Sequence, residues 1–189
     1  VRRARNILEG EESYDKDLWS QVAEMGFTAT AIPEEYGGLG LGYLELCVIA
    51  EELGRSLAPT PFSSSVYLAT ESILQFGSDS LKQANLPSLA SGEKIGAFAH
   101  AESTTSPTEK NITCEFKDGS LSGSKIAVTD GDVADFFIVS AKSGAEVGLF
   151  LVESSIDGVE ITSQPTLDPS RSHASITFKN AKAEALDSG

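Results

Sequence analysis

Apolar residues in the first part of the chain recur at the spacing of amphipathic helices. Tyr14, Leu18, Val22 and Met25 are separated by four, four and three positions. This spacing places the four side chains on one face of a helix, and the residue that follows, Gly26, is of the type that commonly ends one. The pattern predicts a helix over residues 14–25 with a single buried stripe.

Further helices are predicted downstream. The segment 43–54 has an unusually broad apolar face, and we expect it to be a central helix. The segment 62–76 repeats apolar residues at spacings of four and three, and Pro61 helps to set its start. A shorter helix over residues 81–89 is also predicted, with an interruption at Pro87.

Beyond residue 92 the period of the apolar residues changes from about 3.6 to two. Apolar and polar residues alternate over 112–116, Asp118-Gly119 provides a turn, and residues 121–128 return, which predicts a β-hairpin. Further strands are predicted over residues 134–141, 147–152, 159–161 and 174–178.

The change of period also predicts a domain boundary. We expect an N-terminal helical domain over residues 1–92 and a middle β domain over residues 93–189. The fold class is therefore α+β, with helices followed by a small antiparallel β-barrel or sandwich.

Composition and charge narrow the class of protein. With 40% hydrophobic and 22% charged residues, the 189-residue chain is typical of a globular protein. Twenty-eight acidic and 14 basic residues give a net charge of −14, which argues against nucleic acid or an anionic membrane surface as a partner. No apolar run reaches the roughly 18 residues of a membrane span. We expect no membrane insertion and a cytoplasmic protein.

The two cysteines, Cys47 and Cys114, each lie in an apolar periodic stretch, where a small buried hydrophobe is expected. They provide neither a disulfide framework nor the ligand spacing of a zinc site. Pairs of neighbouring glutamates are typical of solvated helix faces, so no metal site is predicted.

Two motifs in the helical part resemble the acyl-CoA dehydrogenase family. Residues 26–40 read GFTATAIPEEYGGLG, which is similar to the family's passage G-(apolar)-x-x-(apolar)-x-x-P-E-x-Y-G-G-x-G. Residues 51–59 read EELGRSLAP, similar to its helix end E-E-L-G-x-x-(apolar)-A-P. The glycines at 37–40 lack the strand-then-helix context of a phosphate cradle, which favours a structural connector.

The strand-rich part resembles the same family. Residues 123–131, GSKIAVTDG, are similar to its G-x-K-x-W-I-T-N-G strand, and residues 168–171, DPSR, to its D-x-T-R passage. The resemblance implies an FAD-dependent oxidoreductase of fatty acid or lipid metabolism that oxidises an acyl-CoA thioester at its α and β carbons. It also implies partners: acyl-CoA, homologous subunits in a homo- or hetero-oligomer, and electron-transfer flavoprotein or another electron acceptor.

The resemblance implies that two strands contact the flavin. Residues 98–108, FAHAESTTSPT, stand where the family has aromatic-x-x-T-E-P-x-x-G-S-D, and Glu102 holds the glutamate position. Ala101 replaces the threonine that faces the flavin ring, Ala127 replaces the tryptophan beside it, and the G-S-D that meets the pyrophosphate has no clear counterpart. These departures predict weakened flavin binding. The candidate cofactor-binding residues are Phe98, His100, Ala101, Ser106, Thr108, Ala127 and Thr129.

Other polar residues have simpler interpretations. His100 and His173 are expected to be structural or solvated rather than catalytic. Asp168 and Arg171, three positions apart, are expected to form a local ion pair, with binding of a substrate phosphate as the alternative. Lys125, near a strand start, is expected to be solvated.

The family's general base, a glutamate, belongs to a C-terminal helical domain that we expect to be absent from this chain, so no catalytic residue is assigned. The first hypothesis is thus that this chain is part of an acyl-CoA dehydrogenase and is inactive alone. The second is a degenerate, non-catalytic partner subunit of a hetero-oligomeric enzyme. The third keeps the fold with the chemistry of an acyl-CoA oxidase or nitroalkane oxidase. Without that domain, we expect apolar surface along the 46–53 helix or on one face of the β domain to be exposed or covered by another copy. This predicts self-association.

Overall fold

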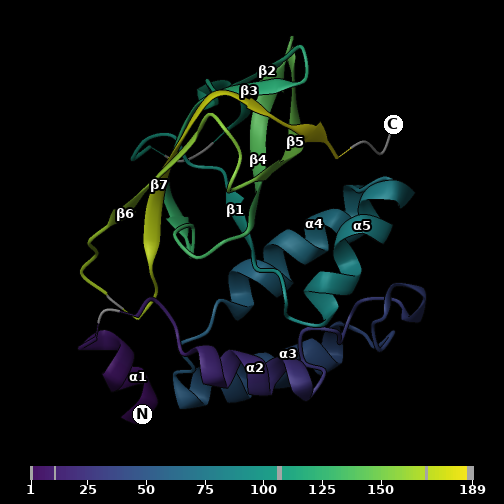
Figure 1. Ribbon diagram of the computed structural model, residues 1–189, viewed down its shortest axis with the longest axis vertical. Coiled ribbons are helices and arrows are strands. Elements are labelled where there is room, and N and C mark those ends of the chain that lie inside the picture. The colour runs from purple at the N-terminus through teal and green to yellow at the C-terminus, as the bar shows by residue number, and fades with distance from the viewer. Residues whose placement is uncertain (1, 11, 106–107, 169, 187–189) are drawn as a thin grey trace.

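The computed structural model describes residues 2–10, 12–105, 108–168 and 170–186. Helices gather at one end of the molecule and strands at the other (Figure 1). The helical elements are α1 (Arg2–Leu8), α2 (Lys16–Glu24), η1 (Glu34–Tyr36), α3 (Tyr43–Ser56), η2 (Ser63–Thr70), α4 (Glu71–Phe76), α5 (Asp79–Ala90) and η3 (Glu109–Asn111). The strands are β1 (Gly96–Ala99), β2 (Glu115–Lys117), β3 (Ser120–Thr129), β4 (Phe136–Ser143), β5 (Glu146–Glu153), β6 (Val159–Gln164), β7 (His173–Lys182) and β8 (Glu184–Ala185). The α+β fold class is confirmed.

The first predicted helix is α2. The Asp15 side chain accepts a hydrogen bond from the Leu18 N–H (2.9 Å), which caps the start of the helix. Trp19 and Val22 are its buried residues, and Gly26, in the left-handed region with φ +78°, lies just beyond its end. None of the helices in the described part of the chain is long and apolar enough to cross a membrane.

The helix α3 does not hold the central position that its apolar face predicted. Leu46 is its one buried residue, and it joins the core cluster of Trp19 and Val22. Leu44 is 75% exposed, and Val48 is 59% exposed. The prediction is wrong because the described chain covers only one side of this helix. Cys47, on the same helix, is exposed rather than buried, whereas Cys114 is buried as predicted.

The predicted helix over 62–76 is built from two elements. It begins with the π-helix η2 and continues as α4. The helix α5 extends through Pro87 to Ala90, so the predicted interruption does not occur. Pro87 is exposed and lies in the last turn of α5, where its missing N–H removes a single hydrogen bond.

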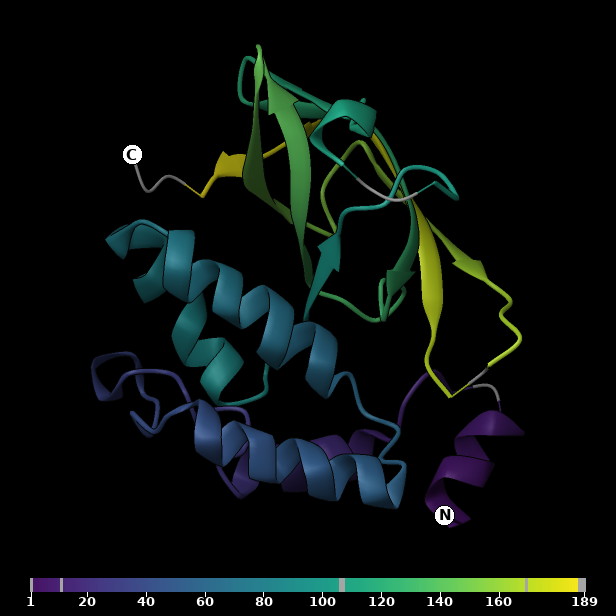
Figure 2. The ribbon, with the colours of Figure 1, turned by 180° about the vertical axis from the view of Figure 1, so that it is seen from behind.

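The strands form one curled sheet (Figure 2). Their order is β6-β7-β3-β2-β4-β5-β8, and β1 pairs with β4. The predicted hairpin is present as β2 and β3, which are antiparallel. However, both β1 and β2 pair with β4 in parallel, so the sheet is mixed and not purely antiparallel as predicted. Parallel pairing requires a crossover connection, which an alternating pattern alone does not reveal.

Apolar side chains from helices and sheet share one core. The cluster that contains Ile73 and Leu86 of the helices also contains Phe136 and Ile138 of β4. At this junction a side chain at Gly96 would meet Ala69 Cβ at 2.5 Å and the Phe136 ring at 2.6 Å, so only glycine fits. The division into two domains near residue 92 stays a prediction.

Candidate flavin-binding site

Two segments that the resemblance assigns to the flavin lie side by side. The Ile126 N–H of β3 donates to the Ala101 carbonyl (2.8 Å), just beyond β1. The backbone at Ala101 therefore lies beside the residue that precedes Ala127. Ala101 is half-buried and Ala127 is exposed.

Ala127 lies in a β-bulge. On β3, Lys125 pairs with Ile176 and Val128 with Ala174, so two residues of β3 face one residue of β7. Ala127 has φ +51°, in the left-handed region that side chains other than glycine rarely adopt. Its N–H donates to the side chain of Gln164 on β6 (3.3 Å). The position of the family's tryptophan therefore carries a small side chain, and its backbone donor is already bound.

Lys125 is fully buried, which contradicts the predicted solvated lysine. Its ammonium group donates to Glu102 Oε1 (2.7 Å), the His100 carbonyl (3.1 Å) and Ser140 Oγ (3.3 Å). These three acceptors match the three N–H donors of a lysine, so the buried charge is fully paired. The alternation along β3 carried the signal, because Lys125 lies in phase with the buried Leu121.

Glu102 connects Lys125 to a neighbouring segment. Its carboxylate accepts hydrogen bonds from the backbone N–H groups of Thr113 (2.6 Å) and Cys114 (3.0 Å), and from the Thr113 hydroxyl. Burial raises the pKa of Glu102, but the hydrogen bonds from Lys125, Thr113 and Cys114 outweigh it, so the pKa lies below its ordinary value. Glu102 is therefore ionised at neutral pH, and it holds the Lys125 side chain beside the backbone of Thr113 and Cys114.

His100 lies beside this pair. Its Nδ1 is 2.7 Å from Ser140 Oγ, and its ring lies 6.0 Å from that of Phe98. Burial, followed by the charge of Lys125, lowers the pKa of His100 below its ordinary value. The imidazole is thus held neutral by protein contacts, which agrees with the predicted structural role.

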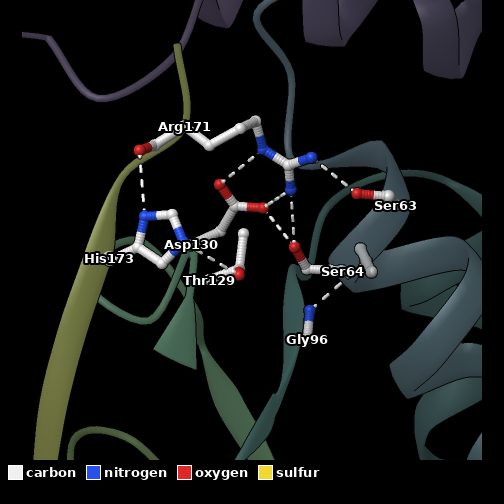
Figure 3. A network of polar contacts seen from close by, with 8 residues as sticks. Ser63, Ser64, Gly96, Thr129, Asp130, Arg171 and His173 are labelled. Carbon is white, nitrogen blue, oxygen red and sulfur yellow. Dashed lines mark hydrogen bonds and ion pairs between the residues drawn. The ribbon is translucent and has the colours of Figure 1, made fainter. Parts of the chain in front are cut away.

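Thr129, the residue that matches the family's threonine, belongs to a second polar network (Figure 3). Its hydroxyl is 3.3 Å from Nε2 of His173, whose Nδ1 is 3.1 Å from the Arg171 carbonyl. The Arg171 side chain forms an ion pair with Asp130, which is 2% exposed. Thr129 and His173 are also paired in the sheet.

The same network joins the sheet to η2. Arg171 donates to the hydroxyl of Ser63 (2.6 Å) and to that of Ser64 (2.9 Å), and the Ser64 hydroxyl also contacts Asp130. Short π-helical segments frequently occur at functional sites because they re-aim side chains. Sequence reasoning missed Asp130, Ser63 and Ser64, since no local pattern relates residues that are 41 to 108 positions from Arg171.

The predicted ion pair between Asp168 and Arg171 is not present. Asp168 instead accepts a hydrogen bond from the Ser170 N–H (3.0 Å), and hydrogen bonding from Ser170 lowers its pKa. Arg171 points toward Asp130, because a buried carboxylate holds a guanidinium more strongly than an exposed one.

The role of the remaining predicted cofactor residues stays a prediction. Phe98 on β1 packs against the core shared by helices and sheet. Thr108 is exposed and precedes η3, and Ser106 lies outside the described residues. Nearby, the hydroxyls of Ser103 and Thr105 bond to each other (2.7 Å).

The comparisons with known proteins agree with the motifs. Residues 1–93 match the family model "Acyl-CoA dehydrogenase, N-terminal domain". The chain is 34% identical over 163 residues to the acyl-CoA dehydrogenase FadE27 of Mycobacterium tuberculosis, covering 86% of this chain and 43% of that protein. The chain belongs to the acyl-CoA dehydrogenase family.

Solved structures show the same fold. The ChsE4-ChsE5 complex of Mycobacterium tuberculosis contains a chain that matches with a TM-score of 0.84 and 30% identity, covering 96% of this chain and 50% of that one. A variant of the Tcur3481-Tcur3483 steroid ACAD matches with a TM-score of 0.88 and 28% identity, covering 99% and 52%. The chain thus spans about half the length or less of the proteins it matches.

The residues present do not fit a self-contained flavin site. Both alanines lack the side-chain contacts that the family motifs supply at these positions. Three of the candidate groups already have partners within the chain: the Ala127 N–H donates to Gln164, the Thr129 hydroxyl contacts His173, and Nδ1 of His100 contacts Ser140.

Proposed function

We propose that this chain is the helical and β part of a non-catalytic subunit in an acyl-CoA dehydrogenase assembly, in which a partner subunit holds FAD. The assembly would oxidise a CoA thioester between its α and β carbons. The observation that carries the proposal is the bulge at Ala127, where a small side chain and an occupied N–H stand in place of the tryptophan motif.

The expected loss of flavin-binding free energy supports this assignment. An aromatic contact contributes about 0.5–1.5 kcal/mol beyond its buried area, and a hydrogen bond contributes about 0.5–1.5 kcal/mol. Losing both, at Ala127 and Ala101, weakens flavin binding roughly ten- to a hundredfold.

Support for a heteromeric partner comes from the two similar solved structures. One is the ChsE4-ChsE5 complex, and the other is the Tcur3481-Tcur3483 steroid ACAD. An assembly of two different subunits allows one of them to lose its cofactor contacts while the other retains them. Within the chain, we assign residues 1–92 to a helical domain and residues 93–189 to a β domain.

A second candidate function is that of a flavin-holding acyl-CoA dehydrogenase subunit. The retained Thr129 favours it, because the chain keeps the threonine of the family's motif and this residue is half-buried at the end of β3. In that case bound FAD would accept hydride from the thioester. The residues that would contact FAD are Phe98, His100, Ala101, Ser106, Thr108, Ala127 and Thr129.

Flavin retention tests the two candidates. The purified chain is incubated with FAD, desalted and examined for the visible absorption band of oxidised flavin. The proposal predicts no retained band, whereas a variant with Ala101→Thr and Ala127→Trp should bind FAD roughly ten- to a hundredfold more tightly than the unchanged chain. Circular dichroism confirms that the variant is folded. Stoichiometric flavin on the unchanged chain would refute the proposal and support the second candidate.

A further inference from the structure

Thr129 and His173 form a cross-strand pair at the ends of β3 and β7. The Thr129 hydroxyl oxygen is 3.3 Å from Nε2 of His173, and Nδ1 of the same imidazole is 3.1 Å from the Arg171 carbonyl oxygen. Both residues of the pair are half-buried, and the contact between their side chains is only partly buried. The pair therefore lies at a surface that is partly open to solvent, and not in a closed cavity.

The contacts of the imidazole determine which of its nitrogens carries the proton. A carbonyl oxygen only accepts hydrogen bonds, so Nδ1 of His173 carries a proton and donates it to the Arg171 carbonyl. In the neutral imidazole Nε2 then has a lone pair and no proton, so the Thr129 hydroxyl donates to it. The single hydroxyl proton of Thr129 is used within the chain, and its oxygen keeps only acceptor capacity toward a ligand.

The buried network behind His173 holds the imidazole in this arrangement. The Arg171 guanidinium pairs with the buried Asp130 and donates to two serine hydroxyls of η2, and the Asp130 N–H donates to the Ser172 carbonyl (2.9 Å). The backbone that presents the Arg171 carbonyl is thereby fixed. Figure 3 shows this carbonyl and the Thr129 hydroxyl on opposite sides of the ring. A ring turned by half a revolution would place carbon atoms at both contacts and lose both hydrogen bonds.

A neighbouring donor of the same segment is bound by the cross-strand partner of His173. Gln164 on β6 pairs with His173 in the sheet, and its Oε1 accepts a hydrogen bond from the Ala127 N–H (3.3 Å). One cross-strand pair thus supplies acceptors both to the backbone donor at Ala127 and to the hydroxyl donor at Thr129. A ligand acceptor beside these two groups finds neither proton free.

We propose that His173 determines which ligand group Thr129 can meet: Thr129 accepts a hydrogen bond from a ligand N–H or O–H, and it offers no proton to a ligand acceptor. Oxidised flavin presents an acceptor at N5, whereas reduced flavin presents an N–H there. His173 is therefore a positioning residue that disfavours oxidised FAD and leaves reduced FAD unaffected. The inference rests on the proposed function, since it takes the strand end with Ala127 and Thr129 as the altered flavin face.

The tautomer of His173 is tested first, on the unchanged chain and without flavin. NMR of the side-chain nitrogens, recorded with the imidazole neutral, should show a protonated Nδ1 and an unprotonated Nε2. The His173→Asn variant assigns the signals, because His100 is the other histidine of the chain. A proton on Nε2 would leave the Thr129 hydroxyl free to donate, and it would overturn the proposal whether or not the chain binds flavin.

Flavin affinity is then measured in the variant with Ala101→Thr and Ala127→Trp, which is expected to bind FAD more tightly than the unchanged chain. Adding His173→Asn keeps a donor for the Arg171 carbonyl but removes the acceptor for Thr129. This change should strengthen binding of oxidised FAD roughly two- to thirteenfold, the ratio that corresponds to one net hydrogen bond. The affinity for reduced FAD, measured without oxygen, should not change. A merely structural role of His173 would alter both affinities together.

Further substitutions separate the hydrogen bond from other effects. His173→Gln, the conservative replacement, again presents an acceptor to Thr129 and should reverse the gain in affinity for oxidised FAD. Thr129→Val removes the hydroxyl, so His173→Asn should have no effect in its presence. Thr177→Val is the matched control, because it removes a hydroxyl that contacts Ser124 across the same two strands and should leave both affinities unchanged. Circular dichroism checks that each variant is folded.

Three outcomes of the flavin titrations would each overturn the proposal: an equal gain for oxidised and reduced FAD, a gain that persists with Thr129→Val, or no gain in a folded His173→Asn variant. The proposed function fails separately, if the unchanged chain retains stoichiometric flavin. The same substitutions are then compared in the unchanged chain, where the expected results for His173 are the same.

Discussion

At the residue scale, the pair of Lys125 and Glu102 shows how strictly a buried charge depends on its partners. The lysine side chain is 0% exposed and that of the glutamate 9% exposed. Removal of one partner from a buried pair leaves an uncompensated charge, which costs about 3–5 kcal/mol. Glu102→Gln should therefore lower the free energy of unfolding by about this amount, as measured by urea denaturation.

A matched exposed pair provides the control. Lys179 and Glu160 form an ion pair between strands, but their side chains are 62% and 59% exposed. Glu160→Gln should change the free energy of unfolding by less than about 1 kcal/mol. If Glu102→Gln were as mild as Glu160→Gln, Lys125 would not be the buried, fully paired cation that the contacts define.

The same pair predicts the response to acid. The pKa of Glu102 is lowered in the folded state, so its stabilisation is present above the ordinary glutamate pKa of about 4.3 and is lost as the pH falls through the folded value. The lowered pKa of His100 acts in the same direction at higher pH. The difference in stability between the unchanged chain and Glu102→Gln should therefore shrink below about pH 4. A difference that stays constant down to pH 2 in acid titrations followed by circular dichroism would contradict this account.

At the scale of elements, the Arg171 network joins the π-helix η2 to the ends of β3 and β7. Arg171→Lys keeps the charge but removes the planar fork that reaches Asp130, Ser63 and Ser64 together. We expect faster amide hydrogen exchange in η2 and a lower free energy of unfolding, by about 1–3 kcal/mol. Asp168→Asn is the control and should change neither quantity, because Asp168 bonds to Ser170. Equal effects of the two substitutions would contradict this account and support the local ion pair between Asp168 and Arg171.

The elements show which structural features can be predicted from local sequence. The helix that contains Trp19 and the hairpin of β2 and β3 follow from spacing and turn residues, because each is determined by neighbours in the chain. The parallel pairing of β1 with β4 and the π-helical form of η2 do not, because they depend on contacts between distant segments.

In the candidate site, too, some features can be predicted from local sequence and others depend on distant segments. The Ile126 N–H next to Ala127 donates to the Ala101 carbonyl, and the role of both alanines toward a flavin stays a prediction. The bulge at Ala127 and the burial of Lys125 are not predicted, since the first is a register shift against β7 and the second depends on acceptors from two distant segments, 100–102 and β4. Alternation along β3 was available as a signal for the lysine, but a charged residue was assigned to solvent.

At the scale of the whole molecule, the uncovered face of α3 is the main departure from a closed core. Tyr43, Leu44 and Val48 are 60%, 75% and 59% exposed, and Met25, Leu39 and Leu41 nearby are also exposed. Contiguous apolar surface of this kind favours association. The net charge of −14 opposes contact between two copies, and salt screens this repulsion.

These two effects together predict self-association that strengthens with ionic strength. Size-exclusion chromatography with light scattering should give a mass that rises with protein concentration, and more so in 0.5 M than in 0.05 M salt, since the Debye length shortens from roughly 14 Å to 4 Å. Leu44→Lys with Val48→Lys should restore the monomer, although the two lysines reduce the net negative charge. This outcome separates the apolar effect from the charge effect, because a reduced net charge alone would promote association. A clean monomer of the unchanged chain at every concentration and salt level would mean that the exposed face of α3 does not drive contact between copies.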